Sequence, residues 1–93
     1  MNSGNTPTNI LHMDKGNLAQ VIDDTIDELA GALKAYPPFH SAHEAFAVLL
    51  EEVDELKEHV WVRQGRRDMP EMYKEAIQCA AMAMRFALEV RDD

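Results

Sequence analysis

Two pairs of oxygen-bearing side chains stand at a spacing that could hold a cation. The run "EEVDELKE" at 51–58 contains five carboxylates, and within it Glu52 and Glu55 are three residues apart. Glu75 and Gln78 repeat this spacing. Residues three apart project from one side of a helix, and Mg²⁺ and Mn²⁺ prefer oxygen ligands. The two pairs therefore predict a hard-cation site, provided that their helices pack antiparallel.

The position of Glu52 within its helix favours a cation site over a solvated acidic face. Glu52 lies between the directions of Val48 and Leu56, inside the apolar stripe. A carboxylate there must find a partner or raise its pKa, because burying an unpaired charge is costly. The remaining carboxylates of the run point away from the stripe and need only contact water: Glu51, Asp54 and Glu58. Acidic helices are common on protein surfaces, so a solvated face remains the alternative.

Three helices must position these side chains. The first is predicted from about Lys15 to Ala35, with Asp14 as its N-cap, and the prolines of "YPPF" at 36–39 end it because proline cannot donate to the helix ladder. The second is predicted to start at Ser41, in the capping box "SAHE" in which Ser41 accepts from the Glu44 backbone and the Glu44 carboxylate reaches back, and to continue to about Arg63.

The third helix is predicted from Met69 or Pro70 to about Val90, with Asp68 as its N-cap. Apolar residues cover most of its circumference, so it must be buried on nearly every side. Two other helices of the same chain cannot surround it. We therefore expect a helical homo-oligomer, most simply a dimer.

Composition limits the remaining possibilities. The 93 residues suit one all-α domain at 14–93, preceded by a flexible polar tail at 1–13. The net charge of −8 argues against a partner such as nucleic acid or an anionic membrane. The apolar runs are too short to cross a bilayer, and the N-terminus lacks the features of a signal peptide. The single cysteine, Cys79, fits a reducing compartment, so we expect a cytoplasmic protein.

The carboxylate pairs also carry a family resemblance. "EEVDE" at 51–55, followed by "EAIQ" at 75–78, resembles the EExxE…ExxD signature of MazG-like nucleotide pyrophosphohydrolases, over about residues 40–90. The run "HSAHEAFAVLLEEVDEL" looks like the phage and prophage members. The resemblance implies an all-α bundle completed by a dimer or tetramer. It also implies Mg²⁺ ligands in this chain, with Gln78 where the family has Asp: Glu52, Glu55, Glu75 and Gln78.

The activity that this resemblance implies is hydrolysis of a nucleoside triphosphate to a monophosphate and pyrophosphate. Magnesium or manganese would bind the triphosphate and activate a water molecule. Glu52 would act as a ligand, and Glu51, or whichever carboxylate is left free of metal, would position the water as a base. Lys74 and Arg85 could neutralise the triphosphate.

A second function stays open. Gln78 brings less charge to the site than an aspartate would. This favours a non-catalytic helical oligomer that keeps the scaffold, holds a cation weakly at most, and binds a partner. Release of pyrophosphate from a nucleotide would distinguish the two.

Overall fold

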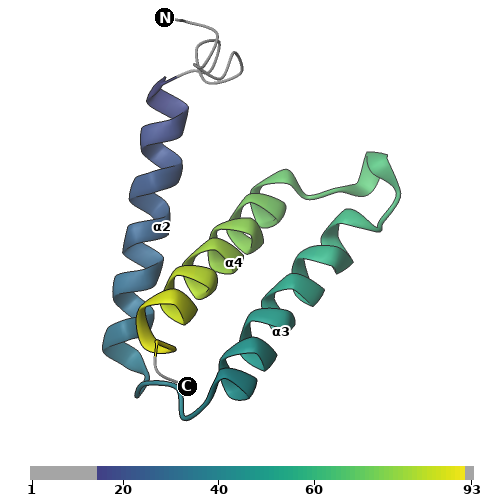
Figure 1. Ribbon diagram of the computed structural model, residues 1–93. Helices are drawn as coiled ribbons and strands as arrows, with labels where there is room; N and C mark the ends of the chain where they lie inside the picture. The colour runs from purple at the N-terminus through teal and green to yellow at the C-terminus, as the bar shows by residue number, and fades with distance from the viewer. Residues whose placement is uncertain (1–14, 92–93) are drawn as a thin grey trace, which may run out of the picture.

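The computed structural model describes residues 15–91 and is all-α over that range (Figure 1). Its elements, in chain order, are α2 (Lys15–Ala35), α3 (Ala42–Val60), the short 3₁₀ turn η1 (Gln64–Arg66) and α4 (Met69–Glu89). The predicted all-α fold of three helices is confirmed. The predicted tail at 1–13 and the predicted N-cap Asp14 lie outside the described residues.

The N-terminal caps of α3 and α4 follow from local sequence. Ser41 Oγ accepts a hydrogen bond from the backbone N–H of Glu44 at 3.1 Å, and Asp68 Oδ1 accepts from the N–H of Glu71 at 3.1 Å. One detail of the predicted capping box differs, because the Glu44 carboxylate accepts from the N–H of His40, at 2.7 Å, one residue before the N-cap. Ser41 is fully extended (φ −159°, ψ 164°), which leaves the preceding N–H within reach of the first helical turn.

Helix α3 ends at Val60, three residues before the predicted end at Arg63. Trp61 leaves the helical conformation (φ −83°, ψ 14°), and the chain then enters the η1 turn. Arg67 Nε donates to the Val60 carbonyl oxygen at 3.1 Å. This bond satisfies a carbonyl that has no partner within the helix and places a positive charge at the negative helix end, which favours termination there.

Helix α4 packs against both other helices (Figure 1). It lies antiparallel to α3, as the short connection at 61–68 requires, and runs in roughly the same direction as α2. Tyr73 Oη donates to Asp24 Oδ2 at 2.6 Å and ties α4 to α2. The buried apolar cluster lies between the helices and consists of Leu29, Ala32, Ala81 and Met82, with Val48 and Leu49 packed against it.

The arrangement is open. Its radius of gyration is 16.0 Å, against about 12 Å for a compact domain of this length. Large apolar side chains remain exposed on every helix; examples are Ile22 and Ile26 on α2, Phe46 and Leu50 on α3, and Met69 and Leu88 on α4. A single chain therefore does not cover the apolar circumference of α4. None of the described helices has the length and apolar character of a membrane span.

Candidate metal centre

The predicted carboxylates of α3 and α4 meet in space. Glu52 and Glu55 project from one side of α3, and Glu75 projects from the facing side of α4. One oxygen from each of these three residues lies within 4.8 Å of the other two. The antiparallel packing of the two helices brings the pairs together, as their spacing predicted.

These three carboxylates differ in their access to water. Glu55 is exposed, Glu52 is half-buried, and Glu75 is buried, with 9% of its surface accessible to water. Burial raises the pKa of Glu52, and the negative charges of Glu55 and Glu75 raise it further. Burial likewise raises the pKa of Glu75, with Glu55 as the next cause. The charge of His59 acts in the opposite direction on Glu75 but does not cancel the rise. The remaining excess of negative charge is the electrostatic condition that a bound metal ion relieves.

Gln78 contacts the same carboxylates and can do so in two ways. With Nε2 facing them, its amide donates to Glu52 Oε2 at 2.9 Å and to Glu75 Oε2 at 3.0 Å. With the amide reversed, its oxygen faces those two carboxylate oxygens, and such a group of oxygens is favourable only around a cation. The first orientation makes Gln78 a neutral bridge, and the second makes it a fourth oxygen ligand.

The donor set suits a hard divalent cation. All the converging atoms are oxygens, and two of the three carboxylates are shielded from water, so Glu52, Glu55 and Glu75 could hold Mg²⁺ or Mn²⁺ while leaving positions open for other ligands. Cys79 lies near the cluster, but burial and then the charge of Glu52 raise the pKa of its thiol. The neutral thiol is a poor metal ligand at neutral pH, which leaves the oxygens as the candidate ligands.

Other predicted site residues lie elsewhere. Glu51 is exposed on α3 and is not part of the three-carboxylate cluster, although its charge contributes to the raised pKa of Glu52. Lys74 is exposed on α4 and does not line the neighbouring pocket. Arg85 does line it, but it lies seven residues from Gln78 along α4, a rise of roughly 10 Å. The roles predicted for Glu51, Lys74 and Arg85 stay predictions.

A pocket of about 570 Å³ extends from the carboxylates along the face of α2. Glu52 and Gln78 line one end together with Glu28 of α2, whose charge also raises the pKa of Glu52. Glu28 was not among the predicted site residues. Thr25 and Ala32, one turn before and one turn after it, are both buried, so Glu28 lies on the packed side of α2, and this is evident only once α2 is placed against α4.

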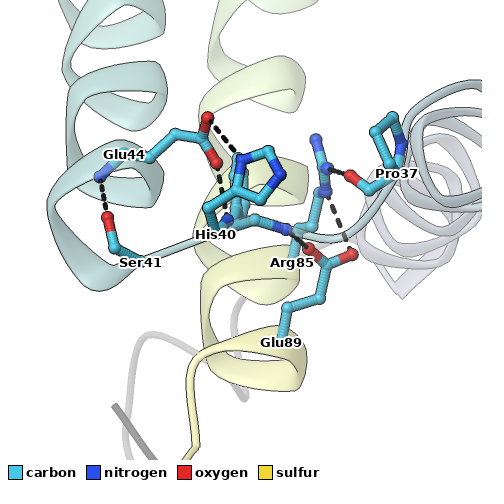
Figure 2. A network of polar contacts seen from close by, with 7 residues as sticks. Pro37, His40, Ser41, Glu44, Arg85 and Glu89 are labelled. Carbon is cyan, nitrogen blue, oxygen red and sulfur yellow. Dashed lines mark hydrogen bonds and ion pairs between the residues drawn. The ribbon is translucent and has the colours of Figure 1, made fainter.

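At the other end of the pocket, Arg85 holds the segment between α2 and α3 (Figure 2). Its Nη2 donates to the Pro37 carbonyl oxygen at 2.7 Å, and its Nε donates to Glu89 Oε2 at 3.2 Å. Glu89 Oε1 accepts in turn from the N–H of Phe39 at 2.9 Å, and the Phe39 ring lies 3.9 Å from the guanidinium carbon. Arg85 and Glu89 are 5% and 12% exposed. This buried pair is charge-balanced and fixes the end of α2 onto α4.

Comparison of the chain with family models, curated proteins and solved structures found no match. The resemblance to MazG-like enzymes therefore stays a prediction, and functional assignment rests on the geometry of the carboxylate cluster and the pocket.

Proposed function

We propose that this protein is a metal-dependent nucleoside triphosphate pyrophosphohydrolase. The observation that supports this proposal most directly is the convergence of Glu52, Glu55 and Glu75 to within 4.8 Å at the end of a pocket. Such a group of partly buried carboxylates is suited to holding Mg²⁺ or Mn²⁺, and these cations bind phosphate oxygens. The substrate would be a ribo- or deoxyribonucleoside triphosphate.

In the proposed reaction, a water oxygen forms a bond to the α-phosphorus and the bond from that phosphorus to the bridging oxygen breaks. The products are a nucleoside monophosphate and pyrophosphate. A cation held there would supply neutralisation of the phosphate charge and a water molecule of lowered pKa. Glu52, Glu55 and Glu75 would hold the cation, with Gln78 as a neutral oxygen ligand. Glu51, which directly precedes Glu52 and lies outside the cluster, or whichever carboxylate is left free of metal, would accept the proton.

The proposed active form is a homo-oligomer, dimer or tetramer, in the cytoplasm. Exposed apolar side chains on all three helices and the open arrangement of the chain support association. The free Cys79 fits a reducing compartment. Light scattering should show a particle of two or four chains at micromolar concentration, and a stable folded monomer would contradict this part of the proposal.

A nucleotide screen tests the activity. Each common ribo- and deoxyribonucleoside triphosphate is incubated with the full chain and Mg²⁺ or Mn²⁺, and pyrophosphate is measured. We expect release from at least one nucleotide, loss of that release in Glu52→Gln, and its retention in Glu58→Gln, whose side chain is exposed. Equal activity in both variants would contradict a reaction at the cluster.

One observation supports a second candidate, a non-catalytic helical oligomer that binds a partner. In the orientation in which Gln78 donates to Glu52 and Glu75, the amide joins the two helices without a metal ion. Such a network would retain the scaffold and hold a cation weakly at most. This candidate predicts no pyrophosphate from any nucleotide at any metal concentration.

A further inference from the structure

The pocket beside the carboxylates has the size and composition of a small-molecule site. Its volume of about 570 Å³ falls within the range of roughly 300–1,000 Å³ that is usual for such sites. Charged groups line its two ends, and the middle is formed by the small residues Gly31 and Ala32 of α2, with Val48 and Met82 opposite. The wall that α2 contributes therefore carries no large side chains in the middle of the pocket, and the middle of the pocket is apolar.

Packing within the chain does not explain why position 31, inside α2, is a glycine. Glycine inside a helix is destabilising relative to alanine. A Cβ at Gly31 would meet no other atom within 4 Å beyond the backbone of its own helix, and its φ is not positive. Neither close helix packing nor backbone conformation requires glycine here. The space above Gly31 belongs to the pocket, so the missing side chain leaves room for an occupant.

Arg85 offers unused hydrogen-bond donors at the far end of the same pocket. A guanidinium carries five N–H donors. Within the described part of the chain, Arg85 uses Nε with Glu89 and one Nη2 donor with Pro37, and its Nη1 has no partner. The side chain is 5% exposed. Buried donors of this kind are satisfied by an acceptor. A carbonyl oxygen has two lone pairs and can accept from both Nη1 donors, whereas a ring nitrogen has only one, so this end of the pocket is best suited to a group bearing a carbonyl oxygen.

From these features we propose that the pocket binds the nucleoside part of the substrate lengthwise along α2. The sugar lies against Gly31, and a base that carries a carbonyl oxygen accepts from Arg85. This inference rests on the proposed function and adds which nucleoside bases the site would prefer. It assigns the free donors of Arg85 to the base rather than to phosphates, because the carboxylates that would hold the metal and the phosphates lie at the other end. Adenine has no carbonyl oxygen, so adenine nucleosides should be the weakest ligands.

The test is a titration of nucleosides, which carry no phosphates, into the full chain with no metal added. Binding is monitored by the NMR chemical shifts of the backbone amides. We expect deoxyguanosine, deoxycytidine and thymidine to shift amides along α2 and around Arg85. Deoxyadenosine should bind about fivefold or more weakly, the difference that one lost hydrogen bond makes. The Gly31→Leu variant should bind none of the four nucleosides. Its melting temperature should be no lower than that of the unaltered chain, because leucine is a better helix former than glycine.

Gly65→Leu is the matched control. Gly65 also has no atom within 4 Å of a built Cβ, but it lies in η1 and does not line the pocket. This variant should bind nucleosides as the unaltered chain does. Equal binding by Gly31→Leu, or equal binding of deoxyadenosine, would overturn the pocket assignment even if pyrophosphate were released. Nucleoside binding without any pyrophosphate release would support the pocket and overturn the proposed reaction instead.

Discussion

The two ends of the pocket bury charge in opposite ways. At one end, Glu52 and Glu75 lie beside Glu55 in an excess of negative charge that His59 offsets only in part, and the pKa of both Glu52 and Glu75 is raised. At the other end, Arg85 and Glu89 neutralise each other and bond to the backbone at 37 and 39.

This difference separates an end suited to a cation from an end that needs none. Arg85 and Glu89 balance each other's charge and bond to the backbone, so the pair holds α2 against α4, and the Nη1 donors of Arg85 remain for a neutral group of a ligand. An unbalanced cluster destabilises the folded chain when it is empty, so these carboxylates could hold a cation that relieves the repulsion. Each experiment below acts on one end and leaves the other as its reference.

The largest effect is expected at the balanced end. Arg85→Ala should lower the free energy of unfolding by about 3–5 kcal/mol, because it leaves Glu89 buried without its partner. Urea denaturation at fixed protein concentration measures this loss. Arg85→Ala combined with Glu89→Gln should recover part of it, since the amide oxygen can still accept from the Phe39 N–H. A loss below about 1 kcal/mol, typical of an exposed pair, would contradict the structural role.

The next effect is expected when metal fills the unbalanced end. Mg²⁺ at about 100 times its Kd should stabilise the fold by about 2.7 kcal/mol, because it binds the folded state alone. The rise in Tm on adding Mg²⁺ checks this expectation. Glu52→Gln should abolish the rise and Glu58→Gln, on the exposed side of α3, should preserve it. Equal responses from the two variants would indicate nonspecific screening of the acidic chain.

A smaller gain is expected from Gln78→Asp. If position 78 contributes a ligand, the added charge should tighten Mg²⁺ binding by about tenfold, or about 1.4 kcal/mol. Calorimetric titration of Mg²⁺ into both forms measures the change. If Gln78 is instead the neutral bridge between Glu52 and Glu75, the new carboxylate will repel both. The variant would then lose stability at neutral pH with no gain in affinity.

The smallest effect concerns pH in the absence of metal. Because the pKa values of Glu52 and Glu75 are raised above 4.5, the folded state binds more protons than the unfolded state between 4.5 and the raised values. Stability should therefore fall as the pH rises through that window and recover on acidification. Glu52→Gln should flatten the profile in that window, as should saturating Mg²⁺.

Glu44 provides an internal reference for this pH profile. The backbone N–H of His40 lowers its pKa, so its contribution is lost only as the pH falls below 4.5. The two effects thus occur in separate ranges of pH. Melting curves recorded across both ranges would contradict the prediction if Glu52→Gln left the profile above pH 4.5 unchanged.

The parts of the structure that depend on local chemistry were predictable. Ser41 and Asp68 mark the starts of α3 and α4 because each cap involves residues within three positions, and the prolines at 37 and 38 end α2. The carboxylate cluster was predictable for a similar reason. Its two pairs each need only helical spacing, and the short connection at 61–68 leaves antiparallel packing as the simple arrangement.

The features that depend on the position of α2 were not predictable in this way. Glu28 and Gly31 become pocket residues only because α2 crosses α4, and the pairing of Arg85 with the Pro37 carbonyl follows from the same packing. The early end of α3 was missed for a related reason, because the Arg67 side chain returns to the Val60 carbonyl. No local pattern encodes these contacts.

The hydrogen bonds that hold α2 to α4 also indicate the order in which the helices assemble and detach. The bonds from Asp24 to Tyr73, from Pro37 to Arg85 and from Phe39 to Glu89 join residues 48 to 50 positions apart, whereas α3 and α4 follow each other closely. Closing a long loop costs more chain entropy than closing a short one, so the α3–α4 hairpin should form first, and α2 should dock last and detach first. In hydrogen–deuterium exchange the amides of α2 should exchange before those of α3 and α4. A ligand lying along α2 should slow that exchange most.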